Sequence, residues 1–208
     1  IMAQPLEETE GSSSVLVSSQ RMNTLIASLN QLNINVTSFG FEDSGSSGYQ
    51  GAPIVLINGE SYTTPKRGVH VVDIELDALL KALYGGKQAL CIDEVDLRKF
   101  TNYQAFDTFG SKQAGDALMK HLNAIKNRNI VMIAVEDSAD EHWPKDAFAF
   151  FKFNLKVKLW NVASIGFRES FCLIAQSGVQ QAYTACVKKP KGHGPAQLNV
   201  MIKLKKDM

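Results

Sequence analysis

The sequence predicts an α/β or α+β fold in which helices pack against a β-sheet, with strand pairs towards both ends of the chain. Short apolar runs such as Ile130–Val135 have the length of buried strands. Between them lie segments whose apolar residues recur every three or four positions, which is typical of amphipathic helices. Alternation of the two kinds of segment indicates layers of helix on sheet. At 208 residues, 45% hydrophobic and 21% charged, the chain suits one globular domain with or without an extension.

The first 53 residues are expected to form an N-terminal extension of a domain at residues 54–208. Residues 1–13 are polar and then rich in serine, which is typical of a flexible tail. Residues 14–18, 20–32 and 35–41 then have the patterns of a strand, a helix and a strand, which we expect to pack on the domain core. A loop rich in glycine and serine follows at residues 43–51.

The middle of the chain contains three predicted strands and one short helix. The strand Ile54–Ile57 ends at Asn58–Gly59, a pair that favours a tight turn between strands. The apolar run Val69–Ile74 predicts the second strand, and Asp77–Leu83 has helical spacing and is followed by two glycines. Residues Gln88–Ile92 are predicted to form the third strand.

The C-terminal half is predicted to hold two helices and most of the sheet. Ser111 is a suitable N-cap for a helix whose apolar face runs from Ala117 to Ile125. The last segment, Leu198–Leu204, has an alternating pattern and lysines at and just beyond its end, which is typical of an edge strand. The other predicted elements are a helix at 145–153 and strands at 129–135, 161–166, 171–176, 182–187 and 198–204.

Charge, hydropathy and motifs exclude several classes of function. The net charge of +1 gives no electrostatic basis for binding nucleic acid, and no apolar run approaches the ~20 residues that span a bilayer. The four histidines are scattered, so no metal site is predicted. The sequence has no nucleotide-binding or nucleophile motif and no acid–base pair of carboxylates. We therefore expect no cofactor and no enzymatic activity.

The cysteines and one sequon bear on the compartment of the protein. Cys172 and Cys186, both in the C-terminal part, are the candidate disulfide, while buried free thiols are the alternative; Cys91 is left over. Asn35 begins the only N-glycosylation sequon, a triplet that is also common by chance.

A polar site is predicted where two apolar strands meet charged residues. Asp137 lies two residues after the strand Ile130–Val135, and Arg168 leads into Phe171–Gln176, so each is expected at a rim of the sheet. Together they offer acceptors and fixed donors for a hydroxylated ligand, or they form a structural salt bridge. Candidates for an apolar wall, each of which also suits the core, are Phe106, Phe109, Trp143 and Phe167.

Five blocks in a fixed order resemble the ILEI/PANDER domain family, also called GG domains. They are Ile57–Glu60, Pro65–Val72, Phe106–Ser111, Ile130–Asp137 and Ile165–Glu169. The resemblance implies a compact mixed β-sandwich of two sheets with short flanking helices. The chain departs from the family in its long link before Phe106, in the phenylalanine-rich segment after Ala139 and in its cysteine positions, so the family's disulfide scheme is not carried over.

The family includes secreted cytokine-like proteins and the sugar-binding stem domain of an O-mannose N-acetylglucosaminyltransferase. In that stem domain the sugar is held by an Asp after the matching strand and by the Arg of a Gly-aromatic-Arg motif, which match Asp137 and Arg168 here. The resemblance implies a secreted lectin for N-acetylhexosamine-type glycans or glycoproteins, with Phe109 or Trp143 stacked on the sugar. A cytokine-like protein that binds a cell-surface receptor is the alternative. A lectin is expected to be a homo-oligomer, because single sugar sites bind weakly.

Overall fold

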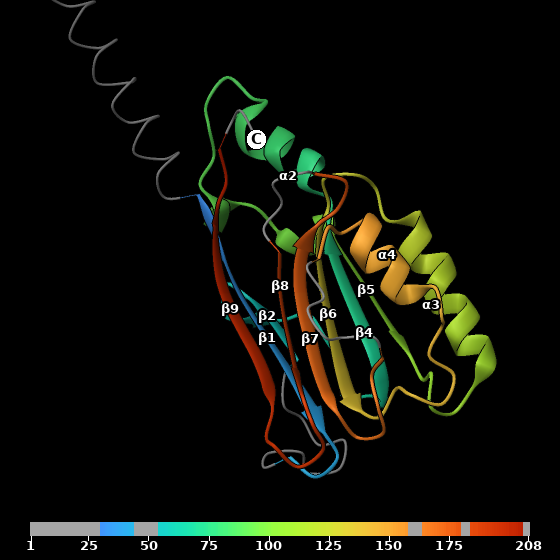
Figure 1. Cartoon of the computed structure of the whole chain (residues 1–208). Helices are drawn as coiled ribbons and strands as arrows, with labels where there is room; N and C mark the ends of the chain where they lie inside the picture. Colours follow the sequence, from blue (N-terminus) through green and yellow to red (C-terminus); the bar gives the residue numbers. More distant parts are fainter. Residues whose placement is uncertain (1–29, 44–53, 158–163, 180–183, 206–208) are drawn as a thin grey trace, which may run out of the picture.

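The computed structural model describes residues 30–43, 54–157, 164–179 and 184–205, and it combines one large sheet with three α-helices in this part of the chain. Figure 1 shows the sheet between β9 on one side and the helices α3 and α4 on the other. The strands are β1 Gln31–Gly40, β2 Val55–Ile57, β3 Glu60–Ser61, β4 Gly68–Ile74, β5 Thr101–Phe106, β6 Ile130–Asp137, β7 Ser170–Gln176, β8 Thr184–Lys189 and β9 Ala196–Lys203. The helices are α2 Leu76–Tyr84, α3 Lys112–Ala124 and α4 Ala147–Phe153, with short 3₁₀ turns η1 Ile92–Glu94 and η2 Leu97–Phe100.

The long strand β1 joins the strands into one connected sheet. β1 is antiparallel to β2 and to β9, and its last two residues pair in parallel with Glu136 and Asp137 of β6. β6 also pairs with β4 and β7, which in turn pair with β5 and β8. The mixed α and β content is as predicted, but the expected sandwich of two separate sheets is not confirmed, because the β1–β6 pairing links all nine described strands.

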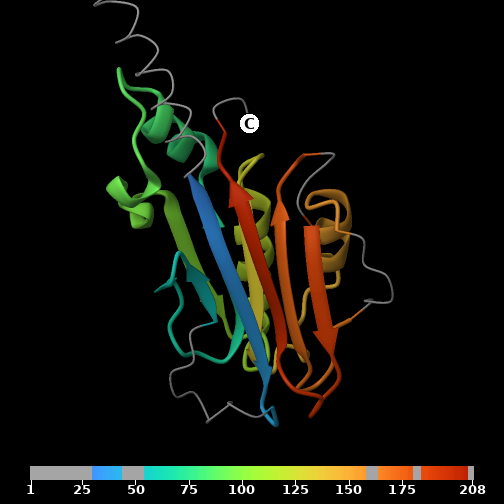
Figure 2. The same ribbon diagram turned by 90° about the vertical axis from the view of Figure 1, so that its left-hand side faces the viewer.

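Two apolar cores lie on opposite faces of the strands around β6. One core packs β1, β2 and β9, together with the leucines of α2, against one face of β4, β6 and β7. The other core packs the opposite face of these strands against α3 and α4. Figure 2 shows β1 and β9 in front of β6, with α3 and α4 behind. Side chains alternate along a strand, so β4, β6 and β7 serve both cores and are buried along most of their length.

Local hydrogen bonds explain one wrong strand prediction. Residues Gln88–Ile92 form a turn that leads into η1, because Leu90 N–H bonds back to Leu83 and Cys91 N–H bonds to the Glu94 carboxylate. Strand β5 was not predicted, since its half-exposed residues lack an apolar run. The predicted strand at 14–18, the loop at 44–51 and most of the predicted helix at 20–32 lie outside the described residues, as do three residues of the predicted strand at 161–166.

The first 53 residues contribute β1, which pairs with β2, β6 and β9. β1 begins at Gln31, so the last two residues of the predicted helix are extended instead. Its buried residues Leu32, Ile34 and Val36 belong to the first core.

The predicted disulfide between Cys172 and Cys186 is wrong. All three cysteines are free thiols. Cys172 on β7 lies opposite Val187 on β8, whereas Cys186 lies opposite Leu173. Neighbouring positions of a strand face opposite sides of the sheet, so Cys172 belongs to the first core and Cys186 packs on the second. The sheet itself separates the two thiols.

Candidate ligand site at one end of the sheet

Loops that join the strands gather at the end of the sheet where β6 finishes, the lower end in Figure 1. The strand registers place Gly40 of β1 beside Asp137 and Gly68 of β4 beside Glu136. β5 ends and β7 begins at the same end, which also holds the connection between β8 and β9. The turn that carries Arg168 lies immediately before β7. The structure therefore brings the predicted residues Asp137 and Arg168 to one rim of the sheet.

Backbone contacts hold Asp137 and Arg168 in unusual conformations. Their φ angles are 65° and 58°, in the left-handed region that side chains other than glycine seldom adopt. The Arg168 N–H donates to the buried Ser138 hydroxyl at 3.2 Å, which ties the turn to the residue after Asp137. Each such conformation costs on the order of 1 kcal/mol and persists only where its surroundings enforce it, a pattern that is common at functional sites.

A second buried serine fixes the start of β7. The Ser38 hydroxyl donates to the carbonyl of Val135 at 2.6 Å and accepts from the N–H of Phe171 at 2.8 Å. Ser38 is fully buried, so these bonds satisfy polar groups that water does not reach. The strands β1, β6 and β7 are thereby locked together next to the turn of Arg168.

The Arg168 side chain contacts two aromatic rings and pairs with Glu42. Its guanidinium carbon lies 4.2 Å from the centre of the Phe41 ring and 4.8 Å from that of Phe167. Its Nη1 lies 2.9 Å from Glu42 Oε1, and Lys191 Nζ lies 3.1 Å from the same oxygen. The hydrogen bond from Lys191, and then that from Arg168, lowers the pKa of Glu42 against the opposing effect of partial burial. The ion pair of Arg168 is thus with Glu42.

Phe109 extends this aromatic surface. Its ring centre lies 6.0 Å from that of Phe167, and the Arg67 guanidinium lies 4.9 Å above it. Arg67 also makes a bidentate pair with Asp107, with distances of 2.9 and 2.7 Å. This hydrogen bonding lowers the pKa of Asp107. Ring and guanidinium contacts therefore run across the rim in the order Phe41, Arg168, Phe167, Phe109 and Arg67.

Trp143 lies in a different aromatic group. Its ring packs 5.4 Å from that of Phe148 and 6.2 Å from that of Phe151, both on α4, and it belongs to the second core. Its buried Nε1 has no hydrogen-bond partner among the described residues. Phe106 is buried in the same core, whereas Phe167 is 45% exposed. Of the predicted wall residues, Phe109 and Phe167 are the two that contact each other beside Arg168.

Asn35 of the sequon lies in the middle of β1. It is paired with Leu56 on one side and Asn199 on the other, and its side chain accepts a hydrogen bond from Thr37 Oγ1 at 3.2 Å. Glycosylation at Asn35 stays a prediction.

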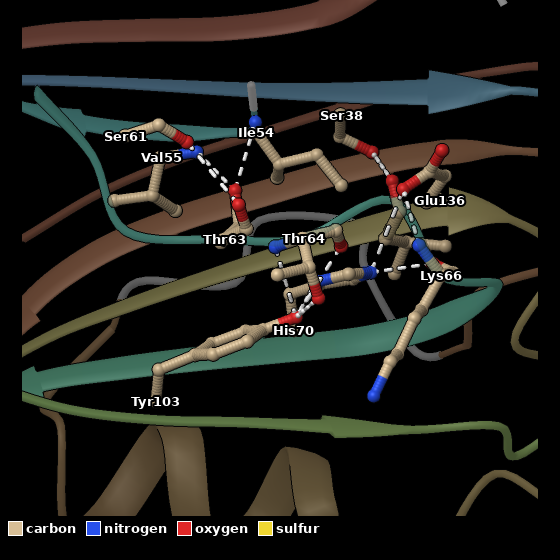
Figure 3. A network of polar contacts seen from close by, with 11 residues as sticks. Ser38, Ile54, Val55, Ser61, Thr63, Thr64, Lys66, His70, Tyr103 and Glu136 are labelled. Atoms are coloured by element: carbon tan, nitrogen blue, oxygen red, sulfur yellow. Dashed lines mark hydrogen bonds and ion pairs between the residues drawn. The ribbon is translucent and has the colours of Figure 1, made fainter. Parts of the chain in front are cut away.

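Buried His70 braces the loop before β4 from beneath (Figure 3). Its Nε2 lies 2.6 Å from the carbonyl of Lys66, which can only accept, so Nε2 carries the proton. Its Nδ1 then accepts from the Tyr103 hydroxyl at 3.1 Å. Glu136 Oε2 lies 3.6 Å from Nε2 and 3.4 Å from the N–H of Lys66. Burial lowers the pKa of His70 to about 4 and raises that of Glu136, so the imidazole is neutral.

The sequence did not point to Phe41, Glu42 or Lys191 as site residues. Glu42 is 126 positions from Arg168 along the chain, and no local pattern links the two. The available signal was that Phe41 and Glu42 directly follow the alternating strand β1, much as Asp137 ends β6.

A family model described as Interleukin-like EMT inducer, ILEI, matches residues 67–179, more than half of the chain. The chain belongs to the ILEI family. The matched segment of this ILEI domain contains Asp137, Arg168 and Phe109, whereas Glu42 and Lys191 lie outside it. A search of curated proteins finds no match. None of the described helices of the ILEI domain is long and apolar enough to cross a membrane.

Proposed function

We propose that this ILEI domain is a secreted, non-enzymatic carbohydrate-binding protein. The observation that carries the proposal is the meeting of Asp137 and Arg168 at one rim, both in left-handed conformations and tied together through Ser138. Sugar sites need convergent hydrogen-bonding groups of fixed position beside an aromatic face, and Phe167 and Phe109 lie next to Arg168. The ILEI family is not a known enzyme family, and it is associated with secreted proteins.

Each residue has a distinct part in the proposed site. The Asp137 carboxylate accepts hydrogen bonds from two sugar hydroxyls, and Arg168 donates to a ring or acetyl oxygen. Phe109, together with its neighbour Phe167, packs on the apolar face of the sugar. The preference for N-acetylhexosamine-type glycans rests on the resemblance of Asp137 and Arg168 to the ligand-holding pair of a sugar-binding relative. A site of this size binds one sugar weakly, so we propose a homo-oligomer whose repeated sites supply avidity.

Glycan-array binding by the wild type, Asp137→Asn and Arg168→Lys tests this proposal. Both substitutions keep side-chain size but remove the carboxylate charge or the forked donor. The matched controls are Asp77→Asn, in an ion pair with Arg128, and Arg98→Lys, which lies over the ring of Tyr62. Both control sites adjoin the opposite end of the sheet, near the end of β4. We expect binding to fall at least about tenfold in the site variants alone. A wild type that binds no glycan, or site variants that bind like it, would refute the proposal.

A second candidate is a cytokine-like ligand of a cell-surface receptor. The observation that favours it is the exposure of Phe41 and Phe167, 44% and 45%, both in contact with Arg168. Aromatic residues together with arginine are typical of the energetic centre of a protein interface. Binding to cells from which glycans have been removed separates the candidates: a receptor ligand still binds and loses affinity with Phe167→Ala, whereas a lectin does not bind.

A further inference from the structure

The carboxylate of Glu42 is held by two cations from separate loops. Oε1 of Glu42 lies 2.9 Å from Arg168 Nη1 and 3.1 Å from Lys191 Nζ. Arg168 comes from the turn before β7, and Lys191 comes from the connection between β8 and β9. Both cations also lie over the ring of Phe167, at 4.8 and 5.7 Å from its centre. Two cations that share one carboxylate oxygen can bind a carboxylate of the protein itself or one that belongs to a ligand.

The Arg168 guanidinium is positioned independently of Glu42. The guanidinium lies over the rings of Phe41 and Phe167, and the backbone N–H of Arg168 is bonded to the Ser138 hydroxyl. Its buried Nε has no hydrogen-bond partner among the described residues. If Glu42 moved away, both aromatic rings would still contact the guanidinium, and Nη1 would be available to an incoming anion.

Glu42 itself can be displaced at small cost. Its side chain is 42% exposed, and the side chains of Arg168 and Lys191 are 28% and 45% exposed. Ion pairs this accessible to solvent contribute little to stability, because water and salt compensate for their loss. A ligand carboxylate that brings further contacts with it can therefore replace Glu42.

From this geometry we infer that Glu42 occupies the place of a ligand's carboxylate, and that the glycan bound at this rim is acidic. The inference rests on the proposed carbohydrate-binding function and specifies the class of glycan. The carboxylate of a sialic or uronic acid binds between Arg168 and Lys191 in place of Glu42. The neighbouring sugar then lies towards Asp137. Glu42 acts as a competitor within the same chain, so it sets the affinity for acidic ligands.

Two substitutions change this competition in opposite directions. Glu42→Gln removes the competing charge but keeps the shape of the side chain, and it is expected to raise the affinity for acidic relative to neutral glycans about tenfold. Lys191→Gln removes one of the two cations and is expected to lower the affinity for acidic relative to neutral glycans about tenfold. Glu75→Gln is the matched control, since Glu75 pairs with Lys126 at 2.9 Å beyond the far end of β4 and its loss changes the net charge equally.

The experiment measures affinities by calorimetry or ligand-observed NMR with two pairs of probes. Sialylated N-acetyllactosamine is compared with N-acetyllactosamine, and a disaccharide of glucuronic acid and N-acetylglucosamine with its glucose counterpart. Circular dichroism confirms that each variant is folded. The inference is supported if at least one acidic probe shows the acidic-to-neutral ratio rising with Glu42→Gln, falling with Lys191→Gln and staying constant with Glu75→Gln.

Other outcomes overturn the inference and separate it from the proposed function. If the ratio of acidic-probe to neutral-probe affinity is the same in the Glu42→Gln and Glu75→Gln variants, the change in affinity comes from net charge alone. Neutral probes that bind while acidic probes bind no better in any variant refute the acidic ligand and leave the lectin proposal standing. If no probe binds any variant, and the glycan array is also blank, the proposed function fails and the inference fails with it.

Discussion

A Cβ atom on Gly40 would lie 2.2 Å from the carbonyl oxygen of Arg168, so the end of β1 and the turn before β7 are in direct backbone contact. Gly40 also pairs with Asp137 in the sheet, and its N–H donates to the buried Asp43 carboxylate at 2.7 Å. One glycine thus separates the two residues proposed to bind the ligand. Its missing side chain is what allows the Arg168 turn to approach the rim.

The change Gly40→Ala is therefore expected to destabilise the protein by about 1–3 kcal/mol, because backbone atoms must move to accommodate the methyl group. Denaturant unfolding measures this loss. Gly86→Ala is the control, since the nearest atom to its added Cβ would be 3.3 Å away, at the carbonyl of Gln88. If the Gly40→Ala protein is as stable as the control, the contact between Gly40 and the Arg168 carbonyl is looser than the distance of 2.2 Å to the added Cβ indicates.

The buried imidazole of His70 makes stability depend on pH. Its pKa falls from 6.5 to about 4 on folding because burial disfavours the charged form. Between these values the unfolded chain binds a proton that the folded chain excludes. The contribution of neutral His70 to the free energy of unfolding is therefore fully present above pH 6.5. Up to about 3 kcal/mol of stability is lost as the pH falls from 6.5 through 4. Glu136 acts in the opposite direction, since burial raises its pKa and acidification relieves that cost.

Comparison with His70→Gln isolates the histidine from Glu136. The free energies of unfolding of the two proteins are measured between pH 7.5 and pH 4. We expect the wild type to lose more stability than the variant over this interval, although the variant is less stable at pH 7.5 through its lost contact with Lys66 or Tyr103. Parallel curves for the two proteins would contradict a neutral, buried His70.

The three thiols are expected to differ in reactivity. Burial raises the pKa of Cys172 to about 12 and also raises that of Cys186, and the thiolate is the reactive form. Iodoacetamide should therefore label half-buried Cys91 in the folded protein before Cys186, and Cys172 only after unfolding. Reducing agent should leave the unfolding midpoint unchanged. Recovery of a Cys172–Cys186 peptide from the non-reduced protein by mass spectrometry would contradict the register of β7 and β8.

Much of the fold follows from local pattern. The apolar runs that form β4, β6 and β7 and the amphipathic helix α3, with Ser111 as its N-cap, were predicted because they are buried and strongly periodic. The half-exposed strand β5 was not predicted, and residues Gln88–Ile92 were wrongly predicted as a strand, because local hydrogen bonds override a short apolar run there. Whether Cys172 and Cys186 can form a disulfide depends on the register of β7 and β8, which sequence spacing does not reveal.

By itself the sequence determined which residues end the buried strands, and so it placed Asp137 and Arg168 at the rim. Tertiary structure alone decided what surrounds them. Glu42 reaches Arg168 from the turn after β1, and Lys191 reaches Glu42 from the β8–β9 connection, through contacts between segments far apart in the chain. The physical reason is that burial is encoded residue by residue in apolar periodicity, whereas a charge on a loop carries no local sign of its partner. Only the assembled sheet brings the Arg168 guanidinium to the Glu42 carboxylate.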